Sequence, residues 1–256
     1  MKCGVKNRKG QNVLTKTTIL LSVVFFMSVI TSDVWAQKKF SRAYPAGQDI
    51  RLVLVNRTGT VIVEGWNRAE VNIQASMEAP AANIVPQNLS GEIVMNLLRD
   101  NQGRDTGNVN FRIRVPFNSK VDIETRIGNL EVSNVRSGLV RAHISSEGDI
   151  TLTNIVSAAV SAENGLGDIF FDGEIQEGGQ YRFASMKGNI ALRIPFTSSF
   201  RLVATAPSTR NITLGAFANS SMNYLGDGRR VVGRFGDGSA ILTVTNQRGG
   251  IKLIGR

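Results

Sequence analysis

Three arginines occupy matching positions in a repeated part of the sequence and could bind an anionic ligand. Aligning four alternating segments gives one shared outward position to Arg141, Ser161, Arg182 and Arg201. Neighbouring strands lie about 4.8 Å apart, so these side chains would form a basic stripe. Arginine holds phosphate or carboxylate groups through paired hydrogen bonds. We therefore predict Arg141, Arg182 and Arg201 as ligand-binding residues, with a merely solubilising face as the alternative.

Residue types suited to catalysis are few. Asp122, Glu124 and Glu131 cluster in one repeat, but carboxylates on an outward strand face are usually solvated. The single histidine, His143, alternates with apolar neighbours and is expected to point outward. The sequence contains no Ser-His-Asp set, phosphate-binding loop or dinucleotide motif. We predict no catalytic residues and no enzymatic activity.

A short sequence motif recurs along the chain: glycine, then Asn or Asp, then a branched aliphatic residue. It occurs at Gly128-Asn129-Leu130, Gly148-Asp149-Ile150, Gly167-Asp168-Ile169 and Gly188-Asn189-Ile190. The glycines are 20, 19 and 21 residues apart, and such a regular period indicates stacked units. Glycine supplies the positive φ of a tight corner, and Asn or Asp tolerates turn geometry. A calcium ladder is the alternative for this column, but the calcium-binding nonapeptide is missing, so we expect no metal.

Two alternating apolar and polar segments flank each motif, and they predict pairs of short strands. One such unit cannot bury its apolar face alone, whereas stacked units build a continuous core. The proline-containing run at 114–121 returns at 193–200, 79 residues later, which indicates one corner used twice. The sequence therefore predicts an all-β, single-domain β-solenoid with rungs of about 20 residues.

The run from Arg114 to Val132, with its Gly-Asp-Ile successors, resembles the DUF4097 family of bacterial adhesins. The resemblance extends from about Tyr44 to Arg256. It implies a β-solenoid exported to the cell envelope or surface, and it offers no catalytic residues to carry over.

Residues 1–36 have the features of a secretory signal peptide. A basic start precedes the apolar run Ile19–Ile30, and small residues at Val34 and Ala36 predict cleavage after Ala36. A retained anchor is the alternative. Cleavage would remove the only cysteine, Cys3, so the mature chain would have no disulfide or thiol chemistry. Five basic residues and one acidic residue would leave with the segment, lowering the formal charge from +10 to +6.

Residues 37–256 are predicted to form one domain. We expect N-terminal strands or a cap at about 44–115, regular rungs at 116–215 and closing strands at 216–256. Within these parts, strands are expected at 50–55, 60–64, 70–75 and 92–98, with a last closing pair at 240–244 and 250–253. The polar segment Asp100–Gly107 is expected to be a loop that could carry function.

The predicted function is that of an exported, non-enzymatic adhesin or structural binding module of the bacterial cell envelope, located in the periplasm or at the cell surface. Expected partners are an anionic envelope polysaccharide, a lipid or another surface protein. We expect no nucleic acid, metal or small-molecule cofactor. Two alternatives stay open: an envelope-stress or signalling accessory domain, as for some family relatives, and a carbohydrate-active β-helix enzyme.

Overall fold

Alternating apolar and polar residues give most elements of this chain one buried and one outer face, as in β-strands. The computed structural model describes Met1 and residues 37–256, so the predicted signal segment otherwise lies outside the described residues. Residues 37–256 form one unit, and their strands all belong to a single 20-stranded sheet. The all-β prediction is therefore confirmed.

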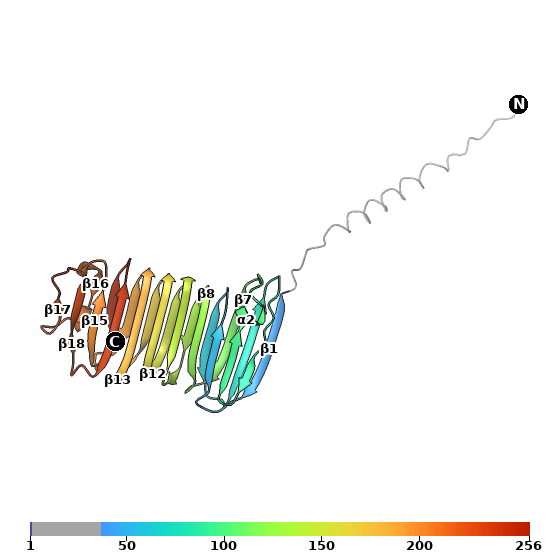
Figure 1. The fold of residues 1–256 in the computed structure, drawn as a ribbon, viewed down its shortest axis with the longest axis horizontal. Helices are drawn as coiled ribbons and strands as arrows, with labels where there is room; N and C mark the ends of the chain where they lie inside the picture. Colours follow the sequence, from blue (N-terminus) through green and yellow to red (C-terminus); the bar gives the residue numbers. More distant parts are fainter. Residues whose placement is uncertain (2–36) are drawn as a thin grey trace. The chain divides into compact units, whose positions relative to one another are not determined.

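The sheet consists of two ladders, in which most neighbouring strands are parallel (Figure 1). In spatial order, the first ladder contains β5 (Gln87–Leu89), β6 (Glu92–Asn96), β2 (Arg51–Val55), β8 (Lys120–Ile127), β11 (Val140–Glu147), the second halves of β12 (Ile150–Leu166) and β13 (Ile169–Lys187), β19 (Ala240–Asn246), β15 (Phe200–Thr205), β18 (Arg230–Phe235) and β17 (Asn223–Tyr224).

The second ladder begins with antiparallel strands and continues with parallel ones. It contains β1 (Lys38–Pro45), β4 (Glu70–Met77), β7 (Val109–Pro116), β3 (Val61–Trp66), β9 (Leu130–Ser133), the first halves of β12 and β13, β14 (Ile190–Ile194), β20 (Ile251–Gly255) and β16 (Ile212–Thr213).

The remaining elements are short. They are β10 (Arg136–Ser137), which pairs with the middle of β12, the helix α2 (Leu97–Asp100), and the 3-10 helices η1 (Thr209–Asn211) and η2 (Gly215–Phe217). Within the described residues, no helix has the length and apolar character needed to span a bilayer.

The inward side chains of both ladders form one hydrophobic core. Leu52, Val121, Val140 and Val160 occupy successive inward positions of the first ladder, and each is at most 2% exposed. Full burial of one such large apolar side chain contributes about 1.5–3 kcal/mol. The alternation seen in the sequence therefore sets which face of each strand is buried.

Glycines turn the corners before the second ladder, as predicted. Gly167 has a φ of +133°, and a Cβ at this position would lie 2.1 Å from the carbonyl oxygen of Gly148 on the preceding rung. The neighbouring Asn/Asp column also joins the rungs. Asp149 Oδ1 accepts a hydrogen bond from Asp168 N (2.8 Å), and Asp168 Oδ1 accepts one from Asn189 N (2.7 Å).

The repeated proline run forms the same turn twice, which confirms that expectation. Ser119 N donates to Pro116 O, and Ser198 N donates to Pro195 O, both at 3.0 Å. Each turn ends a strand of the second ladder, because β7 ends at Pro116 and β14 ends at Ile194.

The prediction that the last two strands close the array is wrong. β19 lies between β13 and β15, and β20 lies between β14 and β16. Leu242 and Val244 of β19 are fully buried and have paired neighbours on both sides. The exposed segment Asn223–Tyr224 forms the edge strand β17 instead. Periodicity defines the faces of a strand but not its neighbours, so it could not reveal this insertion.

The N-terminal strands are confirmed as β2, β3 and β4, although β1 was not predicted. β1 is an edge strand paired only with β4. Most of its residues are exposed, so its sequence lacks the apolar alternation by which the other strands were predicted. The strand expected at 92–98 ends at Asn96, because the Asn96 side chain caps α2 by accepting from Arg99 N. β12 and β13 each combine two short strands that the sequence predicted separately. They are continuous because the residues between the two halves, such as Ile155, remain buried and paired with the neighbouring strand.

Candidate functional site

Arg141 and Arg182 lie on the outer face of the first ladder, as predicted, but each is joined to a carboxylate. The register gives neighbouring outer positions to Asp122, Arg141, Ser161 and Arg182. Arg141 Nη1 lies 3.3 Å from Asp122 Oδ1, and Arg182 Nε lies 2.8 Å from Glu163 Oε1. Burial opposes ionisation of Glu163, but the hydrogen bond and charge of Arg182 outweigh it and hold the pKa of Glu163 below its usual value. Both arginines are therefore partly neutralised.

Arg201 does not continue this row, so its predicted alignment is wrong. Arg182 pairs with Thr243 of the inserted strand β19, and Thr243 pairs with Val203. Arg201 pairs with Ile241 and lies opposite Arg234 of β18. The insertion of β19 and a shift of two residues thus separate Arg201 from the other two arginines.

The segment Asp100–Gly107 begins at the end of α2 and contacts the turn that follows β2. Arg57 Nη1 donates to Arg104 O (3.0 Å), and the Arg57 guanidinium forms an ion pair with Asp105. The Asn101 side chain donates to Asn83 O and Leu97 O, so this loop is held by several contacts.

His143 is partly exposed on the outer face of β11, in agreement with its expected direction. It lies between Glu124 and Glu163 of the neighbouring strands. A hollow of about 340 Å³ at this place also has Arg182 in its wall. Arg182 and Glu163, which both line the hollow, form an ion pair with each other. Their charges are therefore less available to a ligand.

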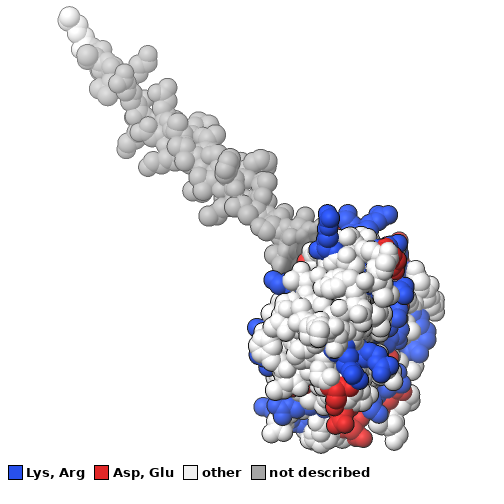
Figure 2. All heavy atoms as spheres, turned by 90° about the vertical axis from the view of Figure 1, so that its left-hand side faces the viewer, with Lys and Arg blue, Asp and Glu red and all other residues white. Residues whose placement is uncertain are grey.

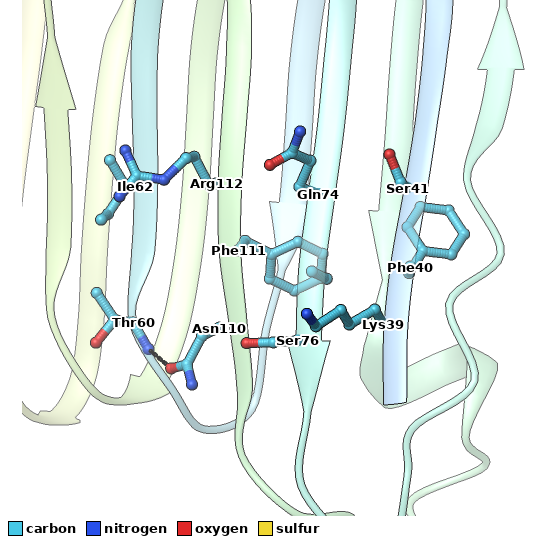
Figure 3. A pocket seen from close by; sticks show the side chains of 11 residues that line it. Lys39, Phe40, Ser41, Thr60, Ile62, Gln74, Ser76, Asn110, Phe111 and Arg112 are labelled. Carbon is cyan, nitrogen blue, oxygen red and sulfur yellow. Dashed lines mark hydrogen bonds between the residues drawn. The ribbon is translucent and has the colours of Figure 1, made fainter. Parts of the chain in front are cut away.

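A larger hollow, the N-terminal groove, crosses the outer face of β1, β4, β7 and β3. It has a volume of about 440 Å³ and is shown in Figure 3. Its polar and charged walls come from Lys39 and Ser41 of β1, Gln74 and Ser76 of β4, Asn110 and Arg112 of β7, and Thr60 just before β3. Ile62 adds an apolar contact surface.

Strand register positions these side chains. Lys39, Ser76 and Asn110 occupy one row across β1, β4 and β7, and Ser41, Gln74 and Arg112 occupy the next. Lys39 extends towards Ser76, and Arg112 extends towards Ile62 (Figure 3). The strands carrying the two cations are two strand spacings apart, or about 10 Å.

The groups of the N-terminal groove remain available to a ligand. Among the residues drawn in Figure 3, the one hydrogen bond that involves a side chain is donated by Thr60 N to Asn110 Oδ1 (2.8 Å). No ion pair connects Lys39 or Arg112 to a carboxylate anywhere in residues 37–256. Arg114, the next outer residue of β7, differs because it pairs with Glu64.

This arrangement suits a hydroxylated, anionic ligand. Hydroxyl and amide groups can exchange hydrogen bonds with sugar hydroxyls, and the two cations can bind carboxylate or phosphate oxygens. The groove walls contain no carboxylate or histidine, so this groove offers no carboxylate pair for acid and base catalysis. In the described part of the chain, no cluster of metal-ligating side chains occurs.

Sequence reasoning did not identify Lys39 and Arg112 as site residues. The alternation around Arg112 places it on an outer face, which was the only available signal. The groove depends on β1 and β7 lying on either side of β4, and these segments are far apart in the sequence.

Comparison with known proteins gives only distant structural likenesses. No protein-family model and no curated protein matches the chain. A solved structure described as a "putative cell adhesion protein" from Clostridium sporogenes is 11% identical, with a TM-score of 0.46, covering 86% of this chain and 100% of that one. A "putative adhesin" from Bacteroides fragilis is 13% identical, with a TM-score of 0.32, covering 86% and 99%.

A further solved structure is a "putative lipid binding protein" from Parabacteroides distasonis. It is 10% identical, with a TM-score of 0.33, and the match covers 85% of this chain and 97% of that one. Identities and scores this low assign neither a ligand nor a function to this chain. Membership of the DUF4097 family stays a prediction, because no family model matches.

Proposed function

We propose that this chain is an exported, non-enzymatic β-solenoid that binds an acidic polysaccharide of a cell surface through the N-terminal groove. The observation that carries the proposal is the pair of unpaired cations, Lys39 and Arg112, among hydroxyl and amide side chains. The stacked parallel strands support the solenoid interpretation, and the predicted signal segment supports export.

The two cations would select the charge of the ligand, and the neutral polar groups would select its hydroxyls. Lys39 is a compact point charge, whereas Arg112 can hold two oxygens at once. Gln74 lies between them on β4 and can both donate and accept. The groove therefore favours a uronic acid or phosphate-bearing sugar over a neutral one.

The proposal predicts that the double variant Lys39→Gln/Arg112→Gln binds a uronic-acid polysaccharide at least tenfold more weakly than the unchanged protein. A charged hydrogen bond contributes about 1.5–3 kcal/mol, and about 1.4 kcal/mol corresponds to tenfold. Isothermal titration calorimetry with acidic and neutral polysaccharides measures both affinity and selectivity.

The matched control is Lys38→Gln/Arg126→Gln, which removes the same formal charge at two exposed positions that form no ion pair within residues 37–256 and lie outside the groove walls. An equal loss in this control would assign binding to net charge and overturn the groove as the site. Release of new sugar ends during incubation would contradict the non-enzymatic part of the proposal.

The predicted residues Arg141, Arg182 and Arg201 belong in the same assay. We expect Arg141→Gln and Arg182→Gln to weaken binding less than Arg112→Gln, because each of these two arginines already forms an ion pair, Arg141 with Asp122 and Arg182 with Glu163. A larger loss in these variants would place the glycan on the first ladder.

A further inference from the structure

The hairpin that ends the first ladder carries two exposed apolar side chains at its tip. Tyr224 is 57% exposed and Leu225 is 36% exposed. They directly precede the turn at Gly226–Gly228, and Arg229 and Arg230 follow it. We define the β17–β18 tip as residues 224–230.

Hydrogen bonds hold this tip in one shape. Leu225 N donates to Arg230 O (2.9 Å), and Gly228 N donates to Leu225 O (3.0 Å). Asp227 Oδ1 accepts from Arg229 N (3.0 Å) and Arg230 N (3.2 Å). The exposed apolar pair therefore projects from an ordered turn and would lose little conformational entropy on docking.

Three arginines on or beside the tip form no ion pair with a carboxylate of the described residues. Thr209 N donates to Gly228 O (2.8 Å), which places η1 and its Arg210 beside the tip. Across residues 37–256, no carboxylate forms an ion pair with Arg210, Arg229 or Arg230, and all three are exposed. Figure 2 faces this end of the unit and shows several Lys and Arg patches on a largely uncharged surface, one of them bordering an Asp and Glu patch.

We infer that the β17–β18 tip docks on an anionic lipid bilayer. Tyr224 fits the polar boundary of a membrane with its ring and hydroxyl, while Leu225 can enter the acyl region. Arg210, Arg229 and Arg230 can bind lipid phosphates, and each basic residue near an anionic surface contributes to attraction. Charge complementarity and the adjoining apolar pair together point to this occupant.

This surface is separate from the N-terminal groove. The tip belongs to the edge of the first ladder at β17, whereas the groove lies at the β1 edge of the second ladder (Figure 1). A polysaccharide could bind the arginines through its anionic groups, but contact with Leu225 would add little to its affinity. The apolar residues therefore distinguish a membrane from a glycan.

The test is co-sedimentation of the protein with phosphatidylcholine vesicles, with and without phosphatidylglycerol. We expect binding to the anionic vesicles only, and at least a tenfold loss in both Tyr224→Ser/Leu225→Ser and Arg229→Gln/Arg230→Gln. Leu89→Ser/Leu166→Ser is the control for exposed apolar residues elsewhere. Arg104→Gln/Arg126→Gln is the control for charge, because both arginines are exposed. Thermal unfolding of each variant verifies that it is folded.

Unchanged vesicle binding in the apolar variant would overturn the inference, even if the arginine variant lost binding, because it would indicate a purely ionic contact. Equal losses in the controls would also overturn it. Lys39→Gln/Arg112→Gln should retain vesicle binding. The inference and the proposed glycan site can thus fail independently.

Discussion

At the residue scale, Tyr181 illustrates how the core accommodates a polar group. Its side chain is 2% exposed, and its hydroxyl donates to Ser157 O and accepts from Gln176 N, both at 2.7 Å. Burial raises the pKa of Tyr181; the hydrogen bond from Gln176 N partly offsets this effect, and the charge of Glu174 adds a smaller increase. The hydroxyl therefore stays neutral. Its hydrogen bonds link β12 at Ser157 to β13 at Gln176.

Tyr181→Phe should lower the free energy of unfolding by about 1–3 kcal/mol, because it leaves buried backbone groups without a partner. The folded pKa lies above the unfolded value of about 10, so the stabilisation is present below pH 10 and falls as pH rises through the folded pKa. Chemical denaturation from pH 8 to 11 measures both effects. The exposed Tyr224→Phe is the control, and an identical alkaline loss in Tyr181→Phe would contradict this account.

At the element scale, the corners of the stack restrict side-chain size. Each corner glycine lies against the corner glycine of the preceding rung, while the Asn/Asp column adds a hydrogen bond at the same place. The same contact recurs at Gly148, Gly167 and Gly188. A corner is therefore a packing contact between rungs as well as a turn.

Gly167→Ala should destabilise the protein by about 2–5 kcal/mol, since it adds backbone strain at positive φ and a contact with Gly148 O. Gly178 also has a positive φ, of +69°, but a Cβ there would meet nothing within 4 Å. Gly178→Ala should therefore cost only about 1–2 kcal/mol. Urea denaturation measures the free energy of unfolding of both variants. Equal decreases would show that backbone strain, and not the contact with Gly148 O, explains the need for glycine at position 167.

At the scale of the whole described unit, chain order and spatial order differ near the C-terminus. β20 supplies hydrogen bonds to both β14 and β16, and Arg256 Nη2 lies 3.0 Å from Glu174 Oε1. The last residues of the chain thus connect β14, β16 and Glu174 of β13, which all come earlier in the sequence. The edge strand β1 has one neighbour only.

A chain ending at Asn246 should lose cooperative unfolding, because β16 would lose its one partner, β14 would lose one of two, and the core beneath Ile251 and Leu253 would be open. A protein lacking residues 37–46 should keep a cooperative transition at lower stability, since only an edge strand is lost. Circular dichroism during heating compares the two. Cooperative melting of the shorter C-terminal variant would contradict the inserted position of β20.

The sequence by itself determined the strand class, the corner residues and the buried face of each rung. The distances between Gly148, Gly167 and Gly188 gave the period, and alternation gave the inward and outward side chains. These features depend on backbone geometry within a strand, where successive side chains point to opposite faces. Local pattern is therefore enough to predict them.

Only the tertiary structure decided which strands are neighbours, and this choice determined the candidate site. The insertion of β19 moved Arg201 out of the predicted row. Strand register placed Arg182 opposite Ser161, within reach of Glu163 two residues further along β12. The same long-range pairing brought Lys39 and Arg112 to one groove. Pairing depends on the competing burial of segments far apart in the chain, so no local period contains it.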